Sequence, residues 1–180
     1  MLDTIAWYTP LFGTVSLLIV ARYYSDWKNW RKYYPTILFI NLVSLFAYIL
    51  TVDNPLWLYH ETFLFPNRMI HEFRLILFVF PSIILLYLTF YPYKSVMLKQ
   101  LGYIILWGIA LSIVEVVFVL LKIITYHNGW NMVWSVVIWF IILPVIAIHH
   151  KKPIWVWLIC AVFSVFVIIY FNIPFLDWSK

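Results

Sequence analysis

The chain has almost none of the residues from which disulfide frameworks, metal–thiolate centres and glycine-rich nucleotide loops are built. It holds one cysteine, Cys160, and four glycines among 180 residues. One cysteine cannot form a disulfide within the chain or supply the paired thiolates of a zinc site. No P-loop, Rossmann glycine pattern, nucleophile elbow or DxD-like acidic pair occurs, so enzyme classes that depend on these motifs lose support. No cofactor is predicted.

Charge is also scarce, whereas apolar and aromatic residues are abundant. Only 11% of the residues are charged, 66% are hydrophobic and 22% are aromatic, and the mean hydropathy is +0.96. This composition is far from that of soluble domains and indicates a membrane protein. The net charge of +5 comes from short basic clusters between apolar runs. A bilayer explains such clusters better than nucleic acid does, so nucleic-acid binding is rejected.

Six apolar runs are long enough to cross a bilayer, for which about 20 helical residues are needed. The runs are approximately residues 4–21, 35–52, 70–91, 101–122, 130–148 and 154–173. No linker separates them, so the sequence predicts one integral membrane domain over residues 1–180, an all-α bundle of six transmembrane helices. The first run lacks a basic n-region and a convincing cleavage site, and we expect it to remain as an anchor.

The basic residues predict which way the bundle faces, because Lys and Arg in short loops are retained on the cytoplasmic side. One side would carry eight of them: Arg22, Lys28, Arg31, Lys32, Lys94, Lys99, Lys151 and Lys152. The other side would carry four: Arg68, Arg74, Lys122 and Lys180. Both termini are therefore predicted to lie outside.

Three stretches carry a resemblance to a known group of proteins. They are DWKNWRKYYPTILF from Asp26, YHNGWNMVWS from Tyr126 and HHKKP from His149. They resemble a family of small, uncharacterised multi-span membrane proteins of spore-forming Gram-positive bacteria, and the likeness covers about residues 27–173. It implies a bacterial plasma membrane and says nothing about mechanism.

Two predicted helices carry polar or small residues along one face. The second has Asn41, Ser44, Tyr48 and Thr51, and the fourth has Gly108, Ser112, Glu115 and Lys122. Their spacing places each set on one helical face, which we expect to point into the bundle. Gly108 and Ser112 also form a small-xxx-small pair that allows another helix to approach closely. For the Ser, Thr and Asn positions, packing between helices is the plainer interpretation.

Ionisable residues gather at the mouth of the third predicted helix. His60–Arg74, HETFLFPNRMIHEFR, holds two His, two Glu and two Arg. Counting along the helices places Arg74 ~6 Å and Glu115 ~9 Å below the outer boundary. A central acid in hydrocarbon costs roughly 2.5 kcal/mol or more. Glu115 and Arg74 are therefore predicted to form an ion pair that joins the third and fourth helices.

Around this pair the sequence predicts a polar pocket that opens to the outside. Its expected members are Glu115, Arg74, His71, Glu72, Tyr48 and His127. Two interpretations stay open: a structural ion pair beneath a solvated loop, or a site for a ligand, a proton or an ion. No metal site is predicted, because neither His-Glu pair continues as H-E-x-x-H.

On the opposite surface, His149 and His150 precede Lys151 and Lys152, and we expect this cluster to contact anionic lipid. The leading hypothesis is a multi-pass plasma-membrane protein that binds a small ligand, ion or lipid headgroup in the outer pocket. One alternative is a membrane-embedded enzyme that acts on lipid and uses His71 or Glu115 as acid or base. Another is an accessory subunit whose polar faces dock a second membrane protein.

Overall fold

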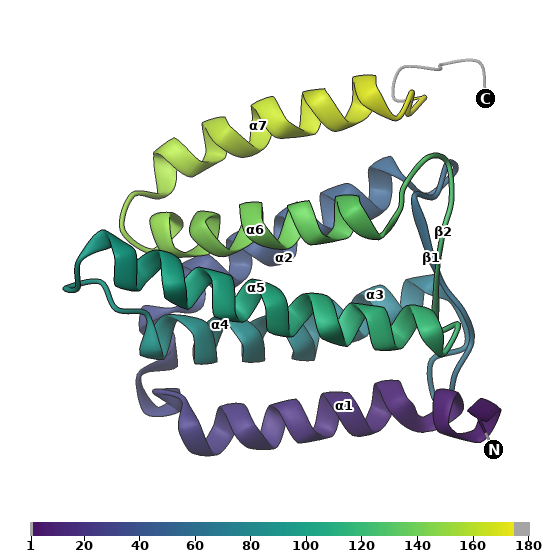
Figure 1. Ribbon diagram of the computed structural model, residues 1–180, viewed down its shortest axis with the longest axis horizontal. Helices are drawn as coiled ribbons and strands as arrows, with labels where there is room; N and C mark the ends of the chain where they lie inside the picture. The colour runs from purple at the N-terminus through teal and green to yellow at the C-terminus, as the bar shows by residue number, and fades with distance from the viewer. Residues whose placement is uncertain (1, 175–180) are drawn as a thin grey trace.

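The computed structural model describes residues 2–174, which form a bundle of long helices joined by short loops (Figure 1). The α-helices are α1 (Leu2–Tyr24), α2 (Tyr34–Leu50), α3 (Arg68–Arg74), α4 (Phe80–Phe90), α5 (Met97–Leu120), α6 (Met132–His149) and α7 (Pro153–Tyr170). The other elements are a 3-10 helix η1 (Trp27–Lys32), a π-helical segment η2 (Leu75–Val79) and the strands β1 (Trp57–Tyr59) and β2 (Ile124–Tyr126). Asp177 and Lys180 lie outside the described residues.

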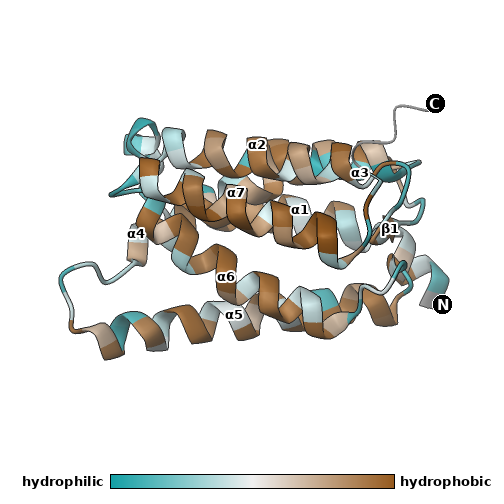
Figure 2. Ribbon diagram, turned by 90° about the horizontal axis from the view of Figure 1, so that it is seen from above, coloured by the Kyte–Doolittle hydropathy of each residue, from teal (hydrophilic) through white to brown (hydrophobic). Residues whose placement is uncertain are grey.

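The helices combine into six rods, because α3, η2 and α4 continue one another from Arg68 to Phe90. Each predicted apolar run falls on one of these rods. Five rods are long and apolar enough to cross a membrane, and α2, with 17 residues, is shorter than the others. Figure 2 shows apolar residues along the rods, with the hydrophilic residues concentrated in loops at the two ends. By the length and composition of its helices, the prediction of a membrane-embedded helical protein is confirmed.

The structure is mostly helical, as predicted, but two loops pair as a short antiparallel ribbon that the sequence did not predict. Trp57, Leu58 and Tyr59 of β1 lie opposite Tyr126, Thr125 and Ile124 of β2. Apart from Leu58, both strands consist of aromatic and β-branched residues, which favour strands, but each strand is only three residues long. The ribbon joins the loop after α2 to the loop after α5, and the backbone N–H of His127 extends the pairing by donating to Leu56 O at 2.9 Å.

The π-helical segment lies where the third rod meets a proline. Pro81 has no backbone N–H to donate to the carbonyl oxygen of Leu77. In an unbroken α-helix its ring would also clash with that carbonyl group. The backbone instead adopts i→i+5 bonding, with Phe80 N–H donating to Leu75 O. Such single-turn widenings are a recognised way to absorb an irregularity within a helix. Here the widened turn follows Arg74 directly, and Leu75 and Val79 line the cavity described below.

The core forms where α2, α4 and α6 meet, and α5 and α7 pack on α6 from the outside. Tyr87, Leu143 and Val156 are fully buried in it. The contact between α5 and α6 is close at Gly108, because a Cβ there would lie 2.8 Å from the Phe140 ring. This is the kind of close approach that the Gly108–Ser112 pair predicts. α7 and α1 lie at opposite edges of the bundle (Figure 1).

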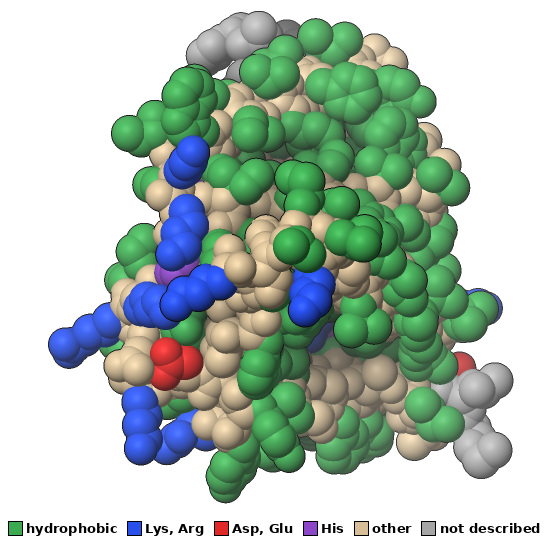
Figure 3. All heavy atoms as spheres, turned by 60° about the vertical axis from the view of Figure 1, so that its left-hand side comes forward, with side chains coloured by type: hydrophobic (Ala, Val, Ile, Leu, Met, Phe, Trp, Pro, Cys, Tyr) green, Lys and Arg blue, Asp and Glu red, His purple; other side chains and the backbone are tan. Residues whose placement is uncertain are grey.

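The loops at the two ends of the bundle differ in charge. All eight basic residues that the sequence assigns to one side lie at or next to the end formed by η1, the α4–α5 loop and the α6–α7 loop. Figure 3 shows this end, where Lys and Arg side chains gather over η1 and its neighbours. The ribbon and the start of α1 lie at the other end (Figure 1). An even number of rods brings the end of α7 back to that side.

Candidate functional site

A cavity of about 360 Å³ lies among α2, the η2–α4 rod, α5, α6 and α7. Its wall is mostly apolar, with residues such as Val43, Leu111 and Phe163 along it. Its only charged lining residues in the described part of the chain are Glu72, Arg74 and Glu115. These three lie toward the ribbon end, so the cavity has an apolar body and one charged end. Its volume is at the lower end of the ~300–1,000 Å³ typical of small-molecule sites.

Arg74 is held at this charged end by α1. Its side chain is only 5% exposed, and Nη1 donates to Thr14 Oγ1 at 3.0 Å. Thr14 in turn donates to Pro10 O at 2.7 Å. The guanidinium Cζ lies 5.3 Å from the centre of the Phe65 ring, a cation–π distance. Nε and Nη2 have no hydrogen-bond partner among residues 2–174.

Glu115 is held by aromatic donors from two other elements. Tyr126 of β2 donates its hydroxyl to Oε1 at 2.8 Å, and Trp139 of α6 donates Nε1–H to Oε2 at 2.7 Å. Burial is the main cause that raises the pKa of Tyr126, so this phenol keeps the proton that it donates. The predicted ion pair between Glu115 and Arg74 is therefore wrong. The two side chains line one cavity, but each makes its hydrogen bonds elsewhere.

Glu72 and Tyr59 complete the charged end. Glu72 is 5% exposed, and Oε1 accepts from Trp57 Nε1 at 3.3 Å. Burial raises the pKa of the Tyr59 phenol, the nearby carboxylates of Glu72 and Glu115 raise it further, and Arg74 opposes them. Tyr59 therefore remains a hydrogen-bond donor beside three charged groups. The ribbon supplies both Trp57 and Tyr59, so it forms the cover of the charged end.

His71, expected in the pocket, instead anchors the loop that precedes α3. It is fully buried, and its Nε2 lies 2.9 Å from His60 O and 3.2 Å from Thr62 Oγ1. Because a carbonyl only accepts, Nε2 carries the proton and donates to His60 O. The ring stacks on Tyr59 with centroids 5.1 Å apart. His71 is not among the residues that line the cavity.

Two other predicted pocket members also lie outside the cavity lining. Tyr48 faces Arg68, whose Cζ lies 5.0 Å from the centre of the Tyr48 ring. Arg68 also donates to the carbonyl and hydroxyl oxygens of Thr51, at 2.7 Å each, and so ties α3 to the end of α2. His127 is exposed, with its Nε2 2.9 Å from Thr125 Oγ1. These residues support the walls and the surface rather than the cavity itself.

Sequence reasoning missed Trp57, Tyr59 and Trp139 as parts of the site. Trp139 was open to detection, because it is a tryptophan deep in an apolar run with an indole N–H that needs an acceptor. Trp57 and Tyr59 gave no comparable signal, since their position depends on the ribbon. Among the residues that the structure describes, no three His, Cys, Asp or Glu come together as a metal site.

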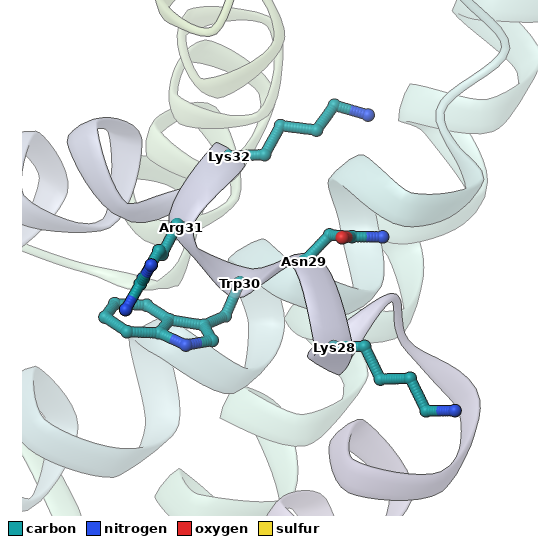
Figure 4. A pocket seen from close by; sticks show the side chains of 5 residues that line it. All are labelled: Lys28, Asn29, Trp30, Arg31 and Lys32. Atoms are coloured by element: carbon teal, nitrogen blue, oxygen red, sulfur yellow. The ribbon is translucent and has the colours of Figure 1, made fainter.

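A second hollow, of about 530 Å³, lies at the surface of the opposite end and is lined by Lys28, Asn29, Trp30, Arg31 and Lys32. Figure 4 shows Lys28 and Lys32 reaching away from Trp30 and Arg31. Five consecutive residues of η1 form this hollow, with no contribution from the helical rods. Its chemistry is that of a basic surface with one aromatic side chain, whereas the cavity of about 360 Å³ brings together residues from distant parts of the chain.

Comparison of the chain with protein-family models, with curated proteins and with solved structures found no match. The resemblance to a bacterial membrane-protein family stays a prediction.

Proposed function

We propose that this protein is a multi-pass plasma-membrane protein that binds one amphiphilic, lipid-like molecule in its central cavity. The observation that carries the proposal is the division of that cavity into an apolar body and a charged end formed by Glu72, Arg74 and Glu115. An acyl chain would fill the apolar body, and a polar headgroup would meet the charged end. Sites that bury most of a ligand in an apolar pocket and orient it with a few polar groups follow this pattern.

The size of the cavity suits one chain of a lipid better than a whole diacyl lipid. Its lining includes Ile159, Phe163 and Val167 of α7, the helix that packs chiefly on α6. α7 is largely exposed, with Val162 at 73% and Ile169 at 70%. An outlying last helix of this kind would let a chain enter from the bilayer.

Filling the cavity tests this function. Ala47 lines the cavity from α2, and Ala47→Phe would place a phenyl ring in its apolar body. Purified in mild detergent, this variant should retain about tenfold less lipid than the parent protein, as measured by mass spectrometry of the extract. A tenfold change corresponds to about 1.4 kcal/mol of binding free energy.

Ala110→Phe is the matched control, because Ala110 is exposed on α5 and does not line the cavity. It should retain lipid like the parent protein. Equal retention by Ala47→Phe and Ala110→Phe would overturn the proposal. A retained lipid that is chemically altered would instead favour the alternative of an enzyme acting on lipid.

The proposed topology has six spans, with α2 as the sixth and the ribbon end outside. The 17 residues of α2 cover ~26 Å, close to the ~30 Å of hydrocarbon and at the lower limit for a spanning helix. The eight basic residues at the other end would then face the cytoplasm. There Lys151 and Lys152, both exposed, would contact anionic headgroups at roughly 1 kcal/mol each.

Cysteine labelling on intact cells checks this topology. In a Cys160→Ala background, Glu61→Cys on the ribbon side should react with an impermeant maleimide, whereas Lys94→Cys in the α4–α5 loop should react only after lysis. Both positions are exposed, so accessibility in the fold does not decide the result. Labelling at Lys94→Cys without lysis would contradict the orientation, and labelling of neither position would contradict the number of spans.

A further inference from the structure

The charged end of the cavity holds groups of opposite sign that do not pair with one another. We propose that the amphiphile bound there has a zwitterionic headgroup, with its phosphate on Arg74 and its ammonium between Glu72 and Glu115. This inference rests on the proposed function, and it adds the chemical class of the ligand.

Arg74 provides a place for the anionic part of the headgroup. Arg74 is 5% exposed, and its one hydrogen bond among the described residues goes to the neutral hydroxyl of Thr14. The two nitrogens that lack a partner, Nε and Nη2, form one edge of the guanidinium. Two N–H groups on one edge match two oxygens of a phosphate or carboxylate in bidentate geometry. Buried N–H groups of a guanidinium that lack an acceptor are costly, and a ligand phosphate would supply the acceptor oxygens.

Glu72 and Glu115 provide a place for the cationic part of the headgroup. Glu115 accepts from Tyr126 and Trp139, and Glu72 accepts from Trp57. All three donors are neutral, so within the described part of the chain neither carboxylate has a cation in hydrogen-bond contact. Both line the cavity. An ammonium group with three N–H donors would supply the missing positive charge.

A headgroup that carries only an anion would bind the free edge of Arg74 and leave both carboxylates without a hydrogen-bonded cation. A headgroup that carries only a cation would leave Nε and Nη2 of Arg74 without an acceptor. A phosphate linked to an ammonium by a short spacer meets both needs at once. The apolar remainder of the cavity makes the source of this headgroup a membrane phospholipid, because a soluble zwitterion would leave that surface unfilled.

Competition between lipids that differ only in headgroup tests the inference. The delipidated full-length protein would be incubated in detergent with equal amounts of phosphatidylethanolamine, phosphatidylglycerol and diacylglycerol of identical chains, and bound lipid would be quantified by mass spectrometry. We expect about tenfold enrichment of phosphatidylethanolamine over phosphatidylglycerol. Arg74→Gln should reduce both phospholipids relative to diacylglycerol. Glu72→Gln should reduce phosphatidylethanolamine alone and so bring the ratio close to one.

The outcomes separate the inference from the proposed function. Equal binding of the two phospholipids, or an unchanged ratio in Glu72→Gln, would overturn the inference of a zwitterionic headgroup. The proposed function would still be supported if the parent protein retains lipid and Ala47→Phe does not. Retention of none of the three lipids would overturn both. Only variants with the circular dichroism spectrum and elution volume of the parent protein are compared. If Glu72→Gln does not fold, Glu115→Gln provides the same test from α5.

Discussion

Replacement of His71 by alanine should lower the free energy of unfolding by about 3–5 kcal/mol, the range for loss of a large buried ring together with its hydrogen bond. The ring is fully buried and stacks on Tyr59. It also donates to the carbonyl of His60 at 2.9 Å, which would lose its partner. The measurement is unfolding by titration with a denaturing detergent in mixed micelles, followed by circular dichroism.

Two further variants show which part of the loss comes from the hydrogen bond. His71→Gln keeps a donor near the position of Nε2 but removes the stacked ring, so its loss should be intermediate. His127→Ala is the matched control, because His127 is exposed on the same end of the bundle. It should change stability by less than about 0.5 kcal/mol. A loss in His127→Ala as large as that in His71→Ala would contradict the anchoring role of His71.

Loss of the Glu115 carboxylate should have the next largest effect. Glu115→Gln keeps the size of the side chain but removes the charge from two short hydrogen bonds, which we expect to cost about 1.5–3 kcal/mol. In a double-mutant cycle with Trp139→Phe, the coupling energy should be about 1–2 kcal/mol, since the indole N–H lies 2.7 Å from Oε2. This exceeds the ~0.6 kcal/mol average for hydrogen bonds between membrane helices because the contact is short and its acceptor is a carboxyl oxygen.

A double-mutant cycle of Glu115→Gln with Arg74→Gln distinguishes the observed contacts from the ion pair that the sequence predicts from the similar depths of Glu115 and Arg74. In delipidated protein, coupling between Glu115 and Arg74 should be smaller than coupling between Glu115 and Trp139, because Arg74 donates to Thr14. A larger coupling energy between Glu115 and Arg74 than between Glu115 and Trp139 would support the direct ion pair instead. Coupling that increases when phosphatidylethanolamine is added would be the expected sign of a headgroup held between the two residues.

The charged end shows what counting along a helix can and cannot predict. That Arg74 and Glu115 lie at a similar level of the bundle was predictable, because the rise per residue converts a position in an apolar run into a distance along the helix. Both residues line the same cavity. Their partners were not predictable, because a helix can rotate about its axis at constant depth. Thr14 and Trp139 meet the two charges only through the way α1 and α6 are turned.

His71 and the ribbon show a second limit. The sequence assigned His71 and Arg74 to one pocket, yet His71 contacts the loop at His60 while Arg74 reaches α1. Residues three apart share a broad face but differ by about 60° in direction, enough to meet different neighbours. The ribbon pairs segments more than sixty residues apart, and its three-residue strands carry no periodicity that a local pattern could detect.

By itself, the sequence determined the rods and their ends. In hydrocarbon each apolar run must satisfy its own backbone N–H and C=O groups, so length and composition are enough to specify a helix. The distribution of Lys and Arg in the short loops likewise determined which ends of the bundle are basic. Only the tertiary structure decided how Glu72, Arg74 and Glu115 are partnered and that all three line one cavity. Lipid tails are as apolar as the helices, so contacts between helices depend on their shape and on a few polar side chains. The sequence of one helix does not specify which neighbour these side chains meet.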